Sequence, residues 1–436
     1  MAYTIATIAL FTLLLLSCLL CSSAKSNTRE LAIGIDDAKC VTRPRPYCGR
    51  SPSPMKFADK RLKQVYPVIQ AFKKRITRDP QGVTKTWVGT NICKYKGFYC
   101  DAPPDNKSAI ALASADFNGF RLAAPTLKGF IDKLPDLALF HANSNNFSGN
   151  DIFAELDNLQ HYLYEFDVSN NNLAGQFPPA FLMLNNITFL DIRYNQFSGP
   201  VPPQIFAKPL DVLFLNNNNF DQFLPENLGS TTALYVTLAN NHFSGPIPRS
   251  IGQAAPTLLE ILFLNNRLSG CLPYEIGYLN RLTLFDAGLN QLTGPIPFSF
   301  ACLEKIERLN LAGNKFYGAV PELLCLVKSL TNLSLSDNYF TFVGPFCMAL
   351  VNRGVLDLRN NCVPGLPFQR SALECAEFFF YRFLEHPKFC DHPFWFAYIP
   401  CNLTHIWGGE RGSGAVTDRP VTAKSPSYAA LEKHRT

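Results

Sequence analysis

The sequence has no long apolar segment after its first two dozen residues. Beyond residue 24, no stretch reaches the ~18–20 consecutive apolar residues that a membrane-spanning helix needs. A hydrophobic C-terminal tail of the kind that signals lipid anchoring is also missing. The first segment, MAYTIATIALFTLLLLSCLLCSSA (residues 1–24), is a short apolar run that ends in small residues. It predicts a cleaved secretory signal peptide, with an N-terminal membrane anchor as the alternative.

Sequence motifs of the common enzyme classes are absent as well. The chain has no H-E-x-x-H pair, no G-x-S-x-G turn, no phosphate-binding loop and no protein-kinase signature. Its seven histidines are scattered. HPKFCDH (386–392) superficially resembles a metal-ligand set, but in a secreted, cysteine-rich segment a disulfide is favoured for Cys390. We therefore expect a binding protein with no catalytic residue, cofactor or metal.

Cysteines and glycosylation motifs fit the secretory route. Of the 14 cysteines, Cys18 and Cys21 fall in the leader, which leaves an even number for disulfides. Cys40 and Cys48 could pair with each other, whereas the sequence does not assign Cys271, Cys302, Cys325 and Cys347. One of these could instead be free or intermolecular, so a homodimer is an alternative to a monomer. N-x-Ser/Thr sequons without proline predict glycosylation at Asn106, Asn146, Asn186, Asn332 and Asn402.

Charge is distributed unevenly along the chain. Residues 25–100 carry 17 Lys and Arg against 5 Asp and Glu, whereas residues 101–361 carry 15 against 22. A basic N-terminal segment followed by an acidic body is informative about binding partners in a way that the total of +6 is not.

Asparagines recur along the acidic region with an apolar residue two positions later. They are spaced about 24 residues apart on average, within the range of leucine-rich repeats. Upstream of each, apolar residues tend to recur at positions −8, −5 and −3, as in Leu163, Phe166 and Val168 before Asn171. Each coil is expected to contribute a short strand whose −5 and −3 side chains point into a shared core. The recurring residues are Asn118, Asn145, Asn171, Asn195, Asn218, Asn241, Asn266, Asn290, Asn314, Asn338 and Asn361.

A second motif follows many of these asparagines, as in FSGPVP (197–202), FSGPIP (243–248) and LTGPIP (292–297). It resembles the plant-specific class of leucine-rich repeats, which implies a plant source and a second strand-like segment in each coil. FDQFLP (220–225) departs from the motif because it lacks the glycine. The fold class expected is an α/β leucine-rich-repeat solenoid of about 11 coils, with disulfide-bonded caps at both ends.

The segments before and after the repeats are expected to cap the solenoid. Leu62, Val65, Ile69, Phe72 and Ile76 form one apolar helical face, and Pro67 is expected to start or kink a helix there. WVGTNICKYKGFYC (87–100) resembles the N-terminal cap of plant extracellular repeats, which implies that Trp87 packs on the first coil and that Cys93 bridges Cys100. At the other end, disulfides are expected for Cys362, Cys375, Cys390 and Cys401. The expected divisions are 25–108 for the helical, basic N-terminal cap, 109–361 for the repeats, 362–408 for the C-terminal cap and 409–436 for a disordered tail.

Residues 50–401 resemble the repeat domain of plant leucine-rich repeat extensins. The resemblance rests on the cap segment KRLKQVYPVIQAFKKRITRDP, on LPDLALFHANSNNFSG and LLEILFLNNRLSGCLP, and on NCVPGLPFQRSALEC. It implies a secreted cell-wall protein whose repeats bind rapid alkalinization factor peptides, which are small, basic and cysteine-containing. The residues after Cys401 contain no Ser-Pro-rich extensin run, which puts anchoring in the wall through such a tail in doubt.

The side chains at −6, −4, −2 and −1 from each asparagine are expected to face outward on the concave sheet. In the first five coils they combine carboxylates with aromatic residues, and Asp167 and Asp191 are expected to be exposed neighbours about 5 Å apart. Such a surface suits a basic ligand, although solenoid faces are often polar only for solubility. The same columns continue through Asn216, Thr237, Glu260, Asp286, Arg308 and Asp357, and Phe117 is placed in them. The proposed ligand contacts are Asp116, His141, Glu165, Asp167, Phe189, Asp191, Arg193, Tyr194, Phe214 and Tyr235.

Three functions follow from these observations. The favoured one is recognition of a basic, cysteine-containing signalling peptide in wall or growth signalling. Inhibition of a pathogen pectin-degrading enzyme, as in polygalacturonase-inhibiting proteins, is the second, and the extensin-like N-terminal segment KRLKQVYPVIQAFKKRI argues against it. The third is adhesion of the basic N-terminal segment to acidic pectin or other wall polymers. We expect neither a nucleic-acid partner nor a membrane span.

Overall fold

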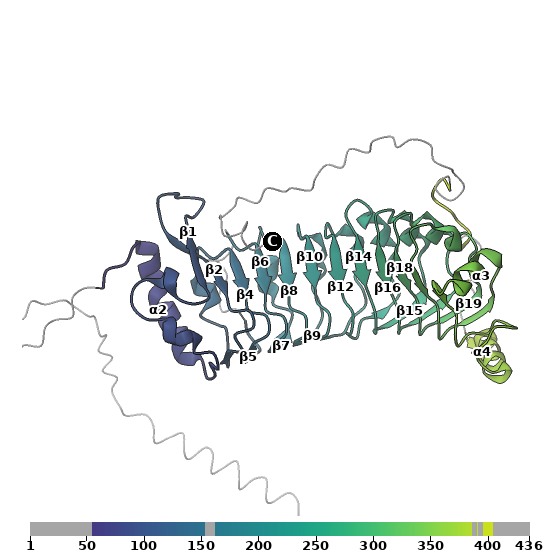
Figure 1. Cartoon of the computed structure of the whole chain (residues 1–436), viewed down its shortest axis with the longest axis horizontal. Helices are drawn as coiled ribbons and strands as arrows, with labels where there is room; N and C mark the ends of the chain where they lie inside the picture. Colours follow the sequence, from purple (N-terminus) through teal and green to yellow (C-terminus); the bar gives the residue numbers. More distant parts are fainter. Residues whose placement is uncertain (1–54, 153–161, 386–389, 391–395, 404–436) are drawn as a thin grey trace, which may run out of the picture. The chain divides into compact units, whose positions relative to one another are not determined.

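A computed structural model describes residues 55–152, 162–385, 390 and 396–403 (Figure 1). The leader, Cys40, Cys48 and the tail after residue 408 lie outside these residues. Within them, no helix is long and apolar enough to cross a membrane. The account below concerns the unit that begins at Met55.

One long sheet of 12 strands takes a strand from every coil. The strands after β2 run parallel in chain order, and β1 pairs antiparallel with β2 (Figure 1). Most are only three residues long, so each presents two side chains to one face and one to the other. The strands are β1 Phe98–Asp101, β2 Ala111–Asp116, β4 Leu139–His141, β6 Glu165–Asp167, β8 Phe189–Asp191, β10 Val212–Phe214, β12 Tyr235–Thr237, β14 Glu260–Leu262, β16 Leu284–Asp286, β18 Arg308–Asn310, β20 Asn332–Ser334 and β22 Leu356–Asp357.

The recurring asparagines hold successive coils together. In Asn195, Nδ2 donates to the carbonyl of Val168 in the preceding coil, and Oδ1 accepts from the amide of Leu173. The same Nδ2 also lies 3.2 Å from the carbonyls of Ile192 and Arg193 in its own coil. A buried amide that satisfies backbone groups of two coils at once explains why this residue type repeats.

The second strand expected in each coil is present in the coils of β2 to β20, in two separate five-stranded sheets. The break between them falls at the coil that lacks the glycine: Gln222 occupies the glycine position, and only an isolated bridge joins Phe223 to Ser244. The first sheet holds β3 Ala123–Ala124, β5 Asn146–Gly149, β7 Asn172–Gln176, β9 Gln196–Gly199 and β11 Asn219–Phe220. The second holds β13 Ser244–Gly245, β15 Arg267–Cys271, β17 Gln291–Gly294, β19 Lys315–Ala319 and β21 Tyr339–Phe342.

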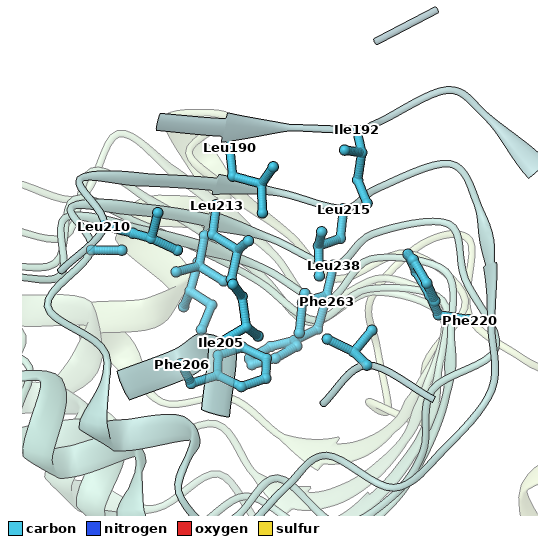
Figure 2. Close-up of a cluster of buried hydrophobic side chains, with 14 of the residues drawn as sticks. Leu190, Ile192, Ile205, Phe206, Leu210, Leu213, Leu215, Phe220, Leu238 and Phe263 are labelled. Carbon is cyan, nitrogen blue, oxygen red and sulfur yellow. The ribbon is translucent and has the colours of Figure 1, made fainter. Parts of the chain in front are cut away.

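Short 3-10 helices complete the coils, and one continuous apolar core lies between the strands and these helices. Figure 2 shows Leu190 and Ile192 of one coil stacked over Leu213 and Leu215 of the next, with Ile205 and Phe206 below. The 3-10 helices are η1 Val83–Thr86, η2 Ile92–Lys94, η3 Ile131–Lys133, η4 Pro179–Leu182, η5 Pro203–Ala207, η6 Leu228–Ser230, η7 Arg249–Ala254, η8 Tyr274–Tyr278, η9 Phe298–Cys302 and η10 Leu324–Leu326.

Helix α2 (Lys60–Arg75) covers the N-terminal end of the core. Asp59 caps it by accepting from the amide of Arg61. The helix therefore begins seven residues before Pro67, which lies inside it, so the expectation of a start at Pro67 is wrong. Phe72 stacks on Phe130 with ring centroids 3.8 Å apart. The ring centroids of Trp87 and Phe117 lie 5.6 Å apart, so Trp87 packs on the first coil as expected.

Five disulfides cross-link the described residues. Cys93 pairs with Cys100, Cys325 with Cys347 and Cys362 with Cys375, all within short sequence separations. The other two, Cys271–Cys390 and Cys302–Cys401, join repeat coils to the C-terminal segment across 119 and 99 residues. Helices α3 (Pro345–Asn352) and α4 (Ala372–Glu385) lie at this end of the chain (Figure 1).

The first coil is shifted by two residues from the asparagine series. Asp116 pairs with His141 in the long sheet, so the residue equivalent to Asn145 is Phe120 and not Asn118. Phe117 is consequently a core position and is fully buried. Its assignment to the outward face is wrong, because a frame based on Asn118 places it at the wrong position of the coil.

Candidate functional site on the outward face of the long sheet

The ten proposed contact residues lie on or beside six adjacent strands, β2 to β12. The register aligns Asp116, His141, Asp167, Asp191 and Phe214 in one column across the sheet. Glu165 and Phe189 are aligned in the neighbouring column, which reaches Tyr235 through Val212. Neighbouring strands lie ~4.8 Å apart, so these side chains form one continuous surface. We call strands β2–β14 the N-terminal half of the outward face, and β16–β22 the C-terminal half.

Asp191 differs from expectation because it is buried, with only 1% of its side chain exposed. Arg193 covers it: the guanidinium Nε lies 3.0 Å from Oδ2, and the Arg193 amide donates to Oδ1. Among the described residues, Oδ2 nonetheless has no hydrogen-bond partner of good geometry. Asp167, directly opposite on β6, remains partly exposed. The sequence did not reveal this burial because it depends on long side chains that fold over from the same and neighbouring coils.

Burial raises the pKa of Asp191 to about 7, and the neighbouring Asp167 carboxylate contributes in the same direction. Arg193 opposes the shift in pKa through its charge and its amide, without cancelling it. The Asp167–Asp191 pair is therefore a place where negative charge is held at a cost, and an incoming cation would reduce that cost.

His141 and Glu165 form an ion pair beside the two aspartates. His141 Nε2 lies 3.1 Å from Glu165 Oε2, and both side chains are mostly buried. Burial works against protonation, but the hydrogen bond and charge of Glu165, followed by the charges of Asp167 and Asp116, raise the pKa of His141 overall. When it is protonated, the imidazole neutralises part of the acidic surface on the β4 side.

Aromatic side chains line the other side of the aspartates. The rings of Phe189 and Phe214 meet edge to face with centroids 6.3 Å apart, and the Arg193 guanidinium lies 4.9 Å above the Phe214 ring. Tyr194 follows directly, and 54% of it is exposed. The surface therefore combines carboxylates, a cation and exposed aromatic area, the residue types enriched in protein-binding interfaces.

Tyr194 adopts a left-handed backbone conformation with φ of 53°. The residue before each recurring asparagine from Asn145 to Asn361 does the same, and at most other coils it is Asn, Ser, Asp or Gly, which tolerate this conformation. Tyr194 and Leu289 are the bulky exceptions within the described coils. A strained aromatic at an exposed position indicates a role that an asparagine would not fill.

A hollow of about 230 Å³ adjoins Arg193 on the β10–β14 side. Phe214 and Tyr235 were among the proposed contacts, whereas Asn216, Thr237 and Glu260 were noted only as column members. Leu262 was missed, because an apolar residue at −4 gives no sequence signal of a site. The full lining is Arg193, Phe214, Asn216, Tyr235, Val236, Thr237, Glu260 and Leu262.

The C-terminal half carries polar groups that pair with one another. Asp286 accepts from the Gly288 amide and from Asn310 Nδ2, and Arg359 pairs with Asp357. Burial raises the pKa of Asp286 too, but these donors counteract the shift. Asp286 and Asp357 therefore have donors and lie opposite neutral residues, whereas Asp191 has Arg193 but lies opposite the Asp167 carboxylate.

The other predicted sites fall at the surface or in the caps. All five sequon asparagines are exposed, including Asn402 in the segment 396–403. Cys93, Cys100, Cys362, Cys375, Cys390 and Cys401 are each disulfide-bonded. No group of three or more His, Cys, Asp or Glu residues in the described part of the chain is arranged to hold a metal ion.

Comparison with known sequences identifies relatives of the repeat region. A family model described as Leucine Rich Repeat matches residues 162–184. Leucine-rich repeat extensin-like protein 1 of Arabidopsis thaliana is 38% identical over 237 residues, which is 54% of this chain and 32% of that protein. Leucine-rich repeat extensin-like protein 2 is 39% identical over 54% of this chain and 30% of its own length. The chain thus matches less than a third of the length of these relatives.

Solved structures share the fold. The ectodomain of the Arabidopsis receptor kinase HAESA, in complex with an N-terminally extended IDA peptide hormone, superposes with a TM-score of 0.56 at 23% identity, over 69% of this chain and 54% of that one. A plant ice-binding protein gives 0.55 at 20% identity, over 71% and 98%. At these identities the likeness concerns the fold alone. The chain is a leucine-rich repeat protein, and leucine-rich repeat extensin-like proteins of Arabidopsis are among its homologues.

Proposed function

We propose that the protein is a secreted, wall-associated binder of a basic, cysteine-containing peptide of the rapid alkalinization factor type, which it contacts through the N-terminal half of the outward face. The observation that carries this proposal is the Asp167–Asp191 pair, in which a buried carboxylate oxygen lacks a good hydrogen-bond partner. A ligand lysine or arginine beside the partly exposed Asp167 would supply the opposite charge to the pair, whose Asp191 member is already covered by Arg193.

The surrounding surface supports the same ligand class. Phe189, Phe214 and Tyr194 provide aromatic area next to the acids, and the hollow beside Glu260 has room for a side chain of the ligand. The kinship with leucine-rich repeat extensin-like proteins supports an extracellular setting, to which five disulfides are suited.

The test is a binding titration of the secreted chain with a synthetic basic, disulfide-bonded peptide. Replacing both acids, Asp167→Asn with Asp191→Asn, should weaken binding at least tenfold and reduce its salt dependence. Asp286→Asn is the matched control, because Asp286 is a partly buried aspartate of the same column in the C-terminal half. An unchanged affinity in the double variant would contradict the assignment of the site.

A second function is favoured by the basic N-terminal cap. Lys60, Lys63 and Lys74 are exposed on α2, and Lys85, Lys94 and Lys96 are exposed on the segment that follows. Such a surface would adhere to de-esterified pectin, a polyanion. Elution of the wall-bound protein by salt would support this role, and retention after Lys60→Gln, Lys63→Gln and Lys74→Gln would count against α2 as the contact.

A further inference from the structure

One sequon lies in a place that the other four do not share. Asn332 is the first residue of β20, in the sequence Asn332-Leu333-Ser334, and its side chain is exposed on the outward face of the long sheet. Asn106 follows β1 in a loop, Asn146 begins β5 of a short sheet, Asn186 precedes β8, and Asn402 lies beyond the repeats. Of the five, only Asn332 is on the sheet that carries the proposed ligand site.

The register places Asn332 in the same column as part of that site. Pairing runs from Tyr235 to Glu260, Leu284, Arg308 and Asn332 across strands β12 to β20. At ~4.8 Å per strand, Asn332 is about 14 Å from Glu260 at the edge of the hollow. A bulky, hydrated oligosaccharide on Asn332 would first cover the neighbouring strands of the C-terminal half, because the hollow lies farther along the sheet.

We propose that Asn332 carries an N-linked oligosaccharide that covers the C-terminal half of the outward face and confines protein ligands to the N-terminal half. Glycan attachment stands on the sequon and its exposure, whereas confinement of the ligand rests on the proposed function. The composition of the covered half agrees with this division. Asp286 is hydrogen-bonded to Asn310, and Asp357 is paired with Arg359. A glycan over the C-terminal half would therefore not deprive these aspartates of a partner.

The first experiment tests attachment alone. The full chain is secreted from plant cells, and its tryptic peptides are treated with peptide N-glycosidase in heavy-oxygen water and analysed by mass spectrometry. We expect Asn332 to be converted to labelled aspartate in most molecules, and Asn332→Gln to lower the intact mass by one glycan. An unmodified Asn332 in the secreted protein would overturn the proposal, whether or not any peptide binds.

The second experiment tests confinement by moving the glycan along the column. Tyr235→Asn creates the sequon Asn-Val-Thr at the same column position on β12. With a glycan there, binding of the synthetic basic peptide should fall at least tenfold below that of the matched control Tyr235→Gln, which gains no sequon. The same variant produced without N-glycosylation should bind with an affinity within about twofold of the control. For Asn332→Gln we expect affinity within twofold of the unmodified sequence.

The outcomes separate the two proposals. If Asn332→Gln lowers peptide affinity more than fivefold, the ligand contacts the C-terminal half and confinement is wrong. If glycosylated Tyr235→Asn binds as well as Tyr235→Gln, confinement is also wrong. If the unmodified sequence binds no basic peptide at all, the proposed function fails, while the mass-spectrometric result on Asn332 still stands.

Discussion

The two halves of the outward face share the same backbone, yet their column aspartates lie opposite different neighbours. In the N-terminal half, Asp191 is opposite another acid, Asp167, and is covered by Arg193. In the C-terminal half, Asp286 is opposite Asn310, which donates to it. The contrast teaches that an acidic column position is a better candidate site where a second carboxylate lies opposite it and one arginine does not offset both.

The pH dependence of the unfolding free energy should show the largest difference between the two halves. Asp191 has a folded pKa of about 7, above the ordinary 3.8, so its contribution to stability is full below about pH 3.8 and is lost as the pH rises through 7. The loss amounts to ~4 kcal/mol at most. His141, whose pKa is also raised, loses its contribution in the same direction.

Urea unfolding at pH 4, 5.5, 7 and 8 measures this effect. Asp191→Asn should strongly reduce the dependence of the unfolding free energy on pH, because it removes the titrating group. Asp286→Asn should reduce it less, since Asp286 has two donors that hold its ionised form. Equal effects of the two substitutions would remove the distinction between the halves.

Charge reversal should separate the halves in ligand affinity. Asp167→Lys places a cation beside the proposed ligand cation, and we expect a ~100-fold loss of affinity, about 3 kcal/mol. Asp357→Lys is the matched reversal in the C-terminal half and should change affinity less than twofold. Calorimetry at low and physiological salt measures both, and a comparable loss in Asp357→Lys would place the ligand elsewhere.

Arg193 should matter more to stability than an exposed arginine of the other half. Arg193→Gln removes the ion pair with Asp191 and the contact with the Phe214 ring, so we expect a loss of about 1–2 kcal/mol at pH 7. Arg308→Gln, on the exposed surface of β18, should cost less than ~0.5 kcal/mol. Unfolding free energies at pH 7 compare them, and the difference should shrink at pH 4, where Asp191 is protonated.

The smallest effect concerns Tyr194 and Leu289, the two bulky left-handed residues that directly precede a recurring asparagine, one in each half. Tyr194→Asn and Leu289→Asn should each relieve backbone strain and stabilise the fold by about 1 kcal/mol or less. Only Tyr194→Asn should weaken peptide binding, because Leu289 lies outside the proposed site. If both leave affinity unchanged, Tyr194 is not a ligand contact.

The repeating part of the structure was predictable because it is local. Asn171, Asn195 and their equivalents satisfy the same backbone groups in every coil, so their spacing alone predicted the strands and the core positions. The departure of FDQFLP from the motif was visible in the sequence, but the division of the short sheets at that coil was not predicted from it. The two-residue shift of the first coil was not predicted, because Asn118 happens to fit the spacing of the recurring asparagines. Only the pairing of Asp116 with His141 shows which residues of the first coil are equivalent to those of the next.

What the sequence determined by itself is therefore the coil: its period, its buried positions and the face on which Asp167, Asp191 and Tyr194 lie. Tertiary structure decided what those residues became. Asp191 is buried because Arg193 folds back over it and Phe214, from the next coil, holds the guanidinium in place. The Cys271–Cys390 and Cys302–Cys401 pairings were decided in the same way, across about a hundred residues. Periodicity determines which way a side chain points, but burial, charge and bonding depend on contacts between side chains that are brought together only when the coils stack.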